Sequence, residues 1–278
     1  MNIPSIKLRY INYACYEIIL PNGKEIVIDP CINYKEPDPK FTRDDFSGAD
    51  YILLSHTHYD HTMDLSYLAN KFNSKVFIGQ MSMMADLQFD DINLDNVYPV
   101  SPMETFEMPD FRLEVFRGKH TFMNNPTNVV SKRIGNQNQY FPAGHNMADI
   151  WGSMEYMDYM ITTNENIRIF INGGGPNKFF YNNIAESMKK ASPNIIFRQS
   201  SSKYTPEEYA QTVASYHAQL VFPLHQDGIE RKTNMTVQDY VDRANDEFLK
   251  VNSFTRMINP KKYEWYEVSM TAVKENSL

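Results

Sequence analysis

The residues with the clearest chemical potential lie in one short stretch, SHTHYDHTMD, at positions 55–64. It holds three of the seven histidines in the chain, His56, His58 and His61, with Asp60 beside the third. His56 and His58 are two residues apart at the end of an apolar run, so in an extended chain both rings leave the same face and can bind one ion. Asp60 and His61 follow where the chain is expected to turn into a helix, within reach of a second ion.

Two imidazoles do not complete a tetrahedral metal site, so further ligands are expected at the ends of other strands. Two histidines meet this requirement, because His120 ends the segment LEVFRGKH and His225 ends QLVFPLH. A lone histidine at a strand end is more often a hydrogen-bonded surface or core residue than a ligand. The metal hypothesis for these two therefore depends on the cluster, whose spacing is improbable by chance.

Composition limits the class of protein. The chain has 278 residues, 42% hydrophobic and 22% charged, which is typical of a soluble globular protein with a sizeable core. A formal net charge of −7 disfavours nucleic acid as a partner. No apolar run approaches the roughly 20 residues that span a bilayer, and the N-terminus lacks a secretory pattern, so no membrane span and a cytoplasmic location are expected. Cys15 and Cys31 are interpreted as ordinary thiols.

The elements that would position these residues favour sheets covered by helices. The segment KLRYINYACYEIIL, a turn at 21–23 and KEIVIDP are typical of a hairpin, and YILLS is the strand that leads into the cluster. Helices are expected at 62–72, 81–91, 179–190, 204–217 and 236–251. Further strands are expected at 75–79, 103–120 with a break at Pro109-Asp110, 153–163, 167–173, 194–200, 219–225 and 261–270.

Two pairs have the spacing of capping boxes, Thr205 with Glu208 and Thr236 with Asp239, and they mark the starts of the last two predicted helices. His217, at the end of the first of these helices, is interpreted as structural, because a cation there favours the helix dipole. No composition break indicates a linker. One domain covering 1–278 is expected.

Residues 121–150 are rich in Asn, Gln, Gly and Pro and lack a sustained apolar period. Long loops in compact domains are usually functional lids or disordered, and a lid over the metal site is expected here. His145 in this segment is a candidate catalytic acid or substrate-binding group. Lys132 and Arg133 are candidate contacts for an anionic substrate, with ordinary surface positions as the alternative.

The motif HTHYDH resembles the signature of the metallo-β-lactamase-fold hydrolases, and the opening hairpin with Asp29-Pro30 and the late Pro223-Leu224-His225 follow in the same order. The chain is most similar to the branch that contains L-ascorbate-6-phosphate lactonase and the N-acyl-phosphatidylethanolamine phospholipase D type enzymes. The resemblance implies an α/β fold, a four-layer αβ/βα sandwich with its metals at one edge between two sheets.

The resemblance also implies how six ligands are divided between two metals. The first metal would be held by His56, His58 and His120, and the second by Asp60, His61 and His225. One or two divalent ions are expected, zinc first, with manganese or iron as alternatives. Asp29 would orient a ligand, although a strand-end cap explains this aspartate equally well.

The implied activity is hydrolysis of a small molecule, a lactone, an amide or a phosphate ester, which could be anionic. The ions would lower the pKa of a bound water to give a hydroxide that Asp60 orients. The main alternative is a degenerate relative that binds metal or ligand without catalysis. An iron oxidoreductase on the same scaffold is disfavoured, because that branch usually has a glutamate in place of His58. Neither the substrate nor the oligomeric state follows from the sequence.

The chain departs from the family pattern after the strand RIFI. Most members have an aspartate there that bridges the two metals, whereas this chain has Asn172, Gly173, Gly174 and Gly175. Two divalent ions with Asp60 as the sole carboxylate leave a charge of about +3, against about +2 with a bridge. The extra charge would attract anions and weaken retention of the second ion, unless a carboxylate from elsewhere, such as Asp149, replaces the bridge.

Overall fold

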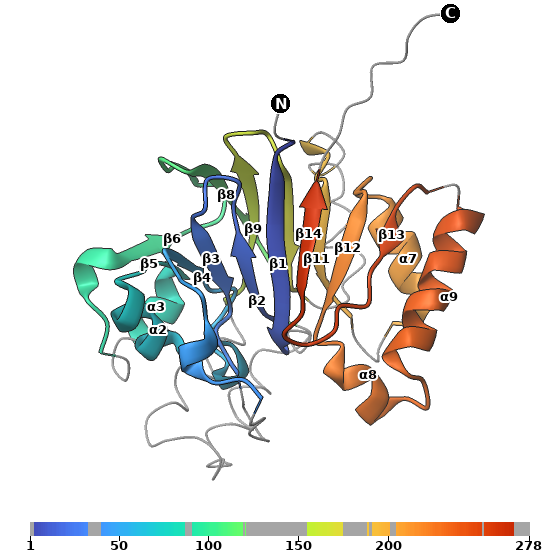
Figure 1. Cartoon of the computed structure of the whole chain (residues 1–278), viewed down its shortest axis with the longest axis horizontal. Coiled ribbons are helices and arrows are strands. Elements are labelled where there is room, and N and C mark those ends of the chain that lie inside the picture. The colour runs from blue at the N-terminus through green and yellow to red at the C-terminus, as the bar shows by residue number, and fades with distance from the viewer. Residues whose placement is uncertain are drawn as a thin grey trace, which may run out of the picture.

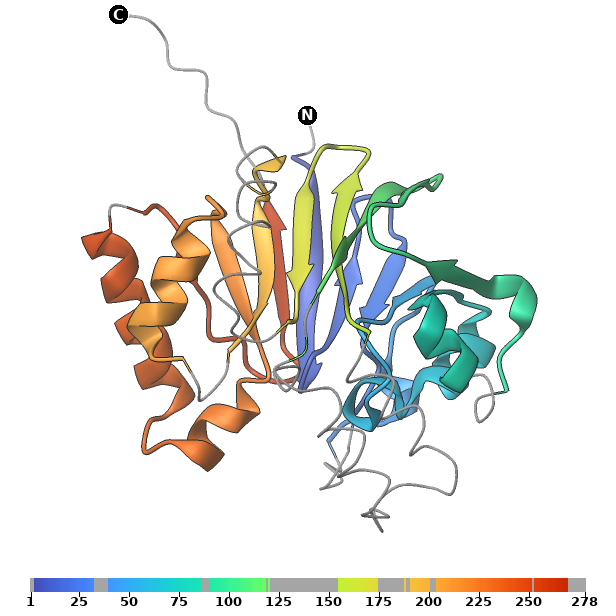
Figure 2. The same cartoon turned by 180° about the vertical axis from the view of Figure 1, so that it is seen from behind.

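A computed structural model describes residues 3–32, 40–86, 91–118, 120, 155–174, 188, 191–200, 204–251 and 253–269. Within these residues, two seven-stranded sheets pack face to face, with helices on the outer side of each (Figures 1 and 2). The order of layers is helix, sheet, sheet, helix. This confirms the predicted four-layer αβ/βα sandwich.

The first sheet joins both ends of the chain. Its strands lie in the order β14 (Trp265–Ser269), β1 (Ser5–Asn12), β2 (Cys15–Ile19), β3 (Glu25–Ile28), β4 (Tyr51–Leu53), β5 (Lys75–Gly79) and β6 (Val97–Val100). The pairs from β14 to β3 are antiparallel and those from β3 to β6 are parallel. The parallel half therefore places the carboxyl ends of β3, β4 and β5 at one edge.

The second sheet has the same mixed design. Its strands lie in the order β13 (Arg256–Met257), β12 (Leu220–Leu224), β11 (Ile195–Gln199), β10 (Arg168–Asn172), β9 (Met157–Thr163), β8 (Phe111–Arg117) and β7 (Thr105–Glu107). Pairs from β13 to β10 are parallel and pairs from β10 to β7 are antiparallel. The strands β8, β10 and β12 consequently run in the same direction.

One apolar core fills the space between the sheets. Leu8 and Phe77 contribute to it from the first sheet, and Leu113, Ile169 and Phe222 from the second, all of them buried. Burial of each such side chain stabilises the fold by about 1.5–3 kcal/mol. Because both sheets share this core, their edges are held in fixed register.

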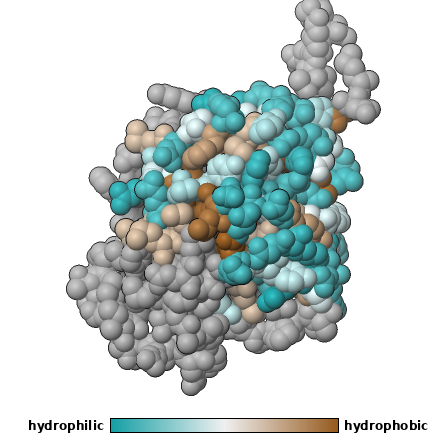
Figure 3. All heavy atoms as spheres, turned by 90° about the vertical axis from the view of Figure 1, so that its left-hand side faces the viewer, coloured by the Kyte–Doolittle hydropathy of each residue, from teal (hydrophilic) through white to brown (hydrophobic). Residues whose placement is uncertain are grey.

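Amphipathic helices cover the outer faces. The helix α2 (Leu65–Phe72) buries Leu65, Leu68 and Ala69 against the first sheet, in the spacing expected for one helical face. It lies beside α3 (Gln80–Asp86), and Figure 3 shows this flank as mainly hydrophilic, with a small hydrophobic patch at its centre. On the second sheet, α7 (Pro206–Ala214) and α9 (Val237–Lys250) pack together, and α8 (Asp227–Lys232) precedes α9.

Both predicted capping boxes are confirmed: the side chains of Thr205 and Thr236 accept from the backbone N–H of Glu208 and Asp239, and each acid returns a bond. The short helix α1 (Tyr59–Thr62) and the 3₁₀ turns Arg43–Asp45 and Leu94–Asn96 are further helical elements of the described ranges. In these ranges, no helix is long and apolar enough to cross a bilayer.

Several elements differ from the predictions. The first predicted strand is two strands, because Tyr13 adopts a left-handed conformation (φ 49°) and turns the chain between β1 and β2. The strands β6 and β13 and the helix α8 were not predicted, the first because Pro99 weakens the strand pattern. Helix α7 ends at Ala214, and His217 beyond it is exposed with φ 56°.

Two predictions fall mainly on parts of the chain outside the described residues. The predicted lid at 121–150 lies entirely outside them, as do His145, Lys132, Arg133 and Asp149. The predicted helix at 179–190 is described only at Met188, which is helical and buried.

Candidate metal centre

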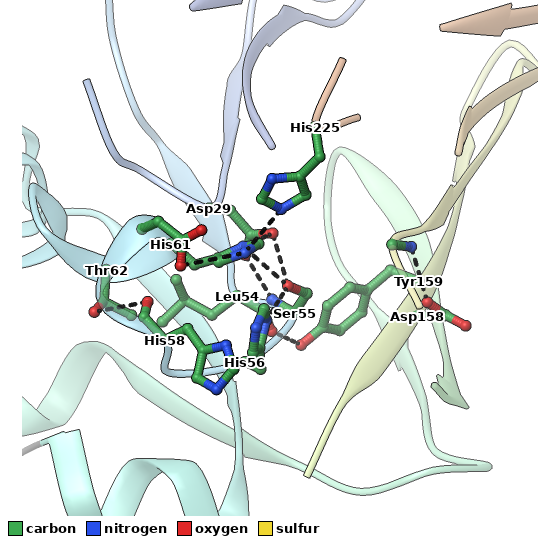
Figure 4. Close-up of polar contacts among 12 residues, drawn as sticks. Asp29, Leu54, Ser55, His56, His58, His61, Thr62, Asp158, Tyr159 and His225 are labelled. Carbon is green, nitrogen blue, oxygen red and sulfur yellow. Dashed lines mark hydrogen bonds and ion pairs between the residues drawn. The ribbon is translucent and has the colours of Figure 1, made fainter. Parts of the chain in front are cut away.

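The six predicted ligands lie together where strands of both sheets end (Figure 4 shows four of the histidines). His56 and His58 follow β4 in the first sheet, while His120 and His225 follow β8 and β12 in the second. Asp60 and His61 are on α1, for which His58 is the N-cap. The site therefore draws residues from the edges of both sheets.

The first group comprises His56, His58 and His120, whose ligand nitrogens all lie within 4.8 Å of one another. The ring centroids of His56 and His58 are 4.5 Å apart, and those of His58 and His120 are also 4.5 Å apart. His56 is buried, and its Nε2 atom has no hydrogen-bond partner among the described residues. A buried nitrogen in this state fits a metal ligand, since an unsatisfied polar atom is otherwise costly.

Hydrogen bonds behind His56 select the tautomer that binds metal. Ser55 Oγ donates to Asp29 Oδ2 at 2.7 Å, and the same hydroxyl lies 2.9 Å from His56 Nδ1. Because the hydroxyl proton is used by the carboxylate, Nδ1 of His56 carries the proton and donates to Ser55. The lone pair of Nε2 is then directed into the centre.

The second group comprises Asp60, His61 and His225, with ligand atoms again within 4.8 Å of one another. The Nε2 atoms of His61 and His225 are 3.1 Å apart, and His61 Nε2 is 3.9 Å from Asp60 Oδ1. Two imidazole nitrogens bound to one tetrahedral zinc at about 2.0–2.1 Å lie roughly 3.3 Å apart. The arrangement and its mixture of nitrogen and oxygen donors fit zinc, manganese or iron.

Asp29 supports both groups from behind. Its Oδ1 accepts from the backbone N–H of Ser55 at 2.7 Å, and its Oδ2 lies 2.8 Å from Nδ1 of His61. The carboxylate accepts a hydrogen bond from Nδ1–H, which leaves Nε2 of His61 to face His225. Asp29 is buried and has φ 44°, an uncommon conformation that places it at the end of β3 facing both partners. It therefore acts as a strand-end cap and also contacts a predicted ligand.

The β1–β2 turn supports His225. His225 has φ 55°, and its backbone N–H donates to the carbonyl oxygen of Tyr13 at 2.7 Å. Tyr13 is itself left-handed, and its ring centroid is 6.2 Å from that of His225. Two non-glycine residues with positive φ thus meet at the second group, where surrounding structure must hold them in place.

The electrostatics suit cation binding. Burial and the neighbouring histidines hold the pKa of His56 well below its usual range, and burial with His61 lowers the pKa of His225. Burial opposes ionisation of Asp60, but His61 and His225 outweigh it and lower the pKa of its carboxyl. For His61, burial is outweighed by Asp29 and Asp60, which raise its pKa. These shifts favour a neutral imidazole at His56 and His225 and an ionised carboxylate at Asp60, whereas Asp29 and Asp60 favour a proton on His61 that a metal ion would have to displace.

The glycine-rich stretch that lacks the family's aspartate is held by buried charges. Asp158 on β9 accepts from Asn172 Nδ2 at 2.8 Å and from the backbone N–H of Gly173 at 3.1 Å. Arg198 on β11 donates to the carbonyl oxygens of Asn172, at 3.2 Å, and Gly174. Both charged side chains are buried. The backbone of this turn is therefore fixed from both its N–H and its C=O groups.

Sequence reasoning gave no role to Ser55, Asp158, Arg198 or Tyr156, which stands next to the first group. A signal existed for Asp158 and Arg198, since each is the one charged residue of an apolar segment, MDYMITT and NIIFRQ respectively. Such residues are rarely buried without a partner. Tyr156 has no comparable signal, because an aromatic residue before a strand is ordinary core composition.

Curated relatives match parts of the chain. A protein from Roseiflexus sp. (strain RS-1), named a UPF0173 metal-dependent hydrolase, is 27% identical over 122 residues, 42% of this chain and 50% of that protein. Another metal-dependent hydrolase, from Caldivirga maquilingensis, is 38% identical over 69 residues, 25% of this chain and 29% of its own length. The matched regions thus span half or less of these relatives.

Solved structures share the fold at low sequence identity. A metallo hydrolase from the archaeon Ignicoccus hospitalis superposes with a TM-score of 0.67 at 12% identity, over 96% of this chain and 100% of that chain. An isothiocyanate hydrolase from Delia radicum gut bacteria superposes with a TM-score of 0.62 at 15% identity, over 95% and 99%. The family profile described as "Beta-lactamase superfamily domain" matches residues 24–225, most of the sequence, and the chain therefore belongs to the beta-lactamase superfamily.

Proposed function

We propose that this protein is a metal-dependent hydrolase of a small molecule, with one or two divalent ions and zinc as the expected metal. The main support is the pair of three-residue groups, in which Ser55 and Asp29 direct the Nε2 lone pairs of His56 and His61 towards the centre of the site. A histidine cluster with a structural role would have no need of two such tautomers. The names of the curated relatives support the same class of reaction.

In this proposal, the six ligands bind as two sets, with His56, His58 and His120 in the first and Asp60, His61 and His225 in the second. When bound, the ions lower the pKa of a water and polarise the oxygen of the bond to be cleaved. Asp60, which is part-exposed, orients the attacking oxygen through its carboxylate. His145 is proposed as the acid or substrate-binding group on the lid at 121–150, from the sequence alone.

The proposed substrate is a lactone, an amide or a phosphate ester. The resemblance to the L-ascorbate-6-phosphate lactonase-like branch supports the lactone and the phosphate ester. An anionic group on the substrate is supported by charge, because one carboxylate leaves the two-ion centre at about +3. A single domain over 1–278 is proposed because β14, at the end of the chain, pairs with β1. A cytoplasmic location stays a prediction.

A second candidate function is metal or ligand binding without turnover. The observation that favours it is the turn at Asn172–Gly174, where the bridging carboxylate is missing and the backbone is instead held by Asp158 and Arg198. Asp29 and Ser55 orient the histidines, as either function requires, so turnover is what decides between the two.

The test compares metal content and turnover in the same preparations. Wild type, His225→Ala and the control His217→Ala, an exposed histidine outside both groups, are analysed by inductively coupled plasma mass spectrometry and assayed on a lactone, an amide and phosphate mono- and diesters. Wild type and the control should carry metal and hydrolyse one class, and His225→Ala should lose metal and activity. Turnover that survives complete metal removal would contradict the proposal, and tight metal without turnover of any class would favour the binding function.

A further inference from the structure

Tyr156 lies directly against the first group of ligands. Its ring stacks on the His56 imidazole, with centroids 4.6 Å apart and planes inclined at 30°, and it lies 6.2 Å from the ring of His120. The tyrosine is 4% exposed. It is therefore a buried wall of the centre, stacked on the imidazole whose Nδ1 edge contacts Ser55.

Two glycines make the space that this ring occupies. A Cβ atom built on Gly118, at the end of β8, would clash with Cδ1 of Tyr156, and one built on Gly173, after β10, would clash with its hydroxyl. The backbone N–H of Gly118 also donates to the carbonyl oxygen of Tyr156 at 2.8 Å. The aromatic ring thus lies in a notch between two strand ends, where neither glycine can gain a side chain without displacing it.

The residues on either side of Tyr156 are anchored to the first sheet. Met157 donates its backbone N–H to the carbonyl oxygen of Ser55 at 2.8 Å, the residue before His56. The Glu155 carboxylate accepts the backbone N–H groups of Met81, at 3.2 Å, and Ser82, at 2.7 Å, where α3 begins. These bonds cross between the sheets and fix the tyrosine over the histidine.

The first group has a particular need for such support. Its three ligands are all imidazoles, so no carboxylate among them compensates for the lost attraction if one ring is misdirected. The single hydrogen bond from Nδ1 of His56 to Ser55 holds one edge of the imidazole but does not by itself fix the ring plane. Partners behind a ligating histidine typically change metal affinity by about 10–100-fold when they are mutated.

We propose that Tyr156 is a positioning residue that fixes the plane of the His56 imidazole, so that its buried Nε2 faces the first metal ion. The proposal rests on the proposed metal centre and adds a residue that acts on metal affinity through His56. The aromatic ring carries the effect. The hydroxyl is incidental to it.

The experiment uses the full chain, cobalt(II) as the probe and two tyrosines. Tyr156→Leu removes the stacked ring and Tyr156→Phe keeps it, while Tyr216→Leu and Tyr216→Phe make the same changes at a fully buried tyrosine in the outer core of the second sheet. Cobalt affinity is measured by competition with a chelator, ligand geometry by the visible absorption spectrum, and stability by thermal unfolding of the metal-free proteins.

Tyr156→Leu should lower the cobalt affinity of the first group by about 10–100-fold and change the visible spectrum of the bound ion, whereas Tyr156→Phe should match wild type. Tyr216→Leu should lower the unfolding temperature while leaving affinity and spectrum unchanged, which separates positioning from general stability. Gly173→Ala, which displaces the ring without changing it, should reproduce the effect of Tyr156→Leu and serves if the leucine variant does not fold. Wild-type affinity and spectrum in Tyr156→Leu or in Gly173→Ala would overturn the proposal.

The same preparations separate this inference from the proposed function. Weakened cobalt binding in Tyr156→Leu, together with no turnover by wild type, would support positioning and overturn the hydrolase. Unchanged cobalt binding in an active enzyme would overturn positioning alone. A wild-type protein that binds no cobalt would overturn both.

Discussion

The Nε2 atoms of His61 and His225 lie 3.1 Å apart, although 164 residues separate them in the chain. His61 is held from the first sheet by Asp29, and His225 is held by the backbone of Tyr13 in the β1–β2 turn. The short distance therefore depends on the packing of the two sheets against each other. A metal ion bound here would cross-link the two halves of the sandwich.

Asp29→Asn tests the support of the second group. Asparagine tolerates the left-handed backbone at this position but replaces one acceptor oxygen with a donor. The backbone N–H of Ser55 and Nδ1–H of His61 bond to different oxygens of Asp29, so they cannot both be satisfied. The affinity of the second ion should fall by about 10–100-fold, measured by chelator competition. The control is Asp242→Asn on the exposed face of α9, which should behave as wild type. Unchanged affinity in Asp29→Asn would mean that His61 does not depend on this carboxylate.

Metal addition should stabilise the folded protein selectively. Zinc at about 100 times its dissociation constant should raise the free energy of unfolding by about 2.7 kcal/mol, because it binds only the assembled centre. Magnesium and calcium should have little effect, since both prefer oxygen ligands and five of the six proposed ligands are histidines. The measurement is the thermal unfolding temperature of metal-stripped protein with each ion. His56→Ala should lose most of the zinc shift and His217→Ala should keep it; equal shifts with calcium and zinc would contradict the assignment.

The motif HTHYDH allowed much of the centre to be predicted, because its geometry is local. β4 ends at Leu53, just before the motif, and α1 begins at Tyr59 within it, so the spacing alone places His56, His58 and His61 on one turn of chain. His120 and His225 were predicted because each ends an apolar run, and strands of like direction end at the same edge. The layer order followed from the alternation of strands and helices.

The features that were not predicted depend on contacts between distant residues. The turn at Tyr13 interrupts a continuous strand pattern without glycine or proline, and it is held by the backbone N–H of His225. Asp158 and Arg198 gain their role only when β9, β10 and β11 become neighbours. The notch for Tyr156 likewise requires Gly118 and Gly173, which follow β8 and β10, to lie against the same side chain. Local propensity contains none of this information.

Chelation should remove the two ions at different concentrations. Without a bridging carboxylate, the second ion depends on Asp60, His61 and His225, and it should be lost first in a titration with a chelator followed by metal analysis. Gly174→Asp should tighten that ion by restoring a carboxylate and lowering the net charge. Two equally tight ions in wild type would show that another group already bridges them.

Asn172→Asp provides the contrast for this test. The Asn172 amide donates to Asp158 inside the protein, so a second carboxylate there would face the first in a buried site. Asn172→Asp should destabilise the fold by about 3–5 kcal/mol without tightening the ion, as measured by urea unfolding and chelator titration. If Asn172→Asp raised the affinity of the second ion, as Gly174→Asp is expected to do, the new side chain at position 172 would have to turn towards the metals.

The buried carboxyl of Asp158 should make stability depend on pH. Burial raises its pKa from 3.8 to about 7, against the opposing effects of Arg198 and Asn172. Below pH 3.8 the group is protonated in the folded and the unfolded chain, so it adds no pH dependence there. Between these values the unfolded chain loses its proton first, and a rise in pH therefore favours unfolding by up to roughly 1.4 kcal/mol per pH unit. Above the folded pKa the carboxyl is ionised in both states, and its effect on stability no longer changes with pH.

Asp158→Asn removes this titration, so its stability relative to wild type should improve as pH rises from about 5 to about 7 and then level off. Its absolute stability can be lower, because asparagine cannot accept from both Asn172 and Gly173 as the carboxylate does. The measurement is urea unfolding of both metal-stripped proteins across this range, with Asp242→Asn as the control that should follow the wild-type profile. A constant difference in the free energy of unfolding between Asp158→Asn and wild type would show that Arg198 keeps the carboxyl ionised throughout. If the variant instead became less stable relative to wild type as pH rises, the ion pair would outweigh burial.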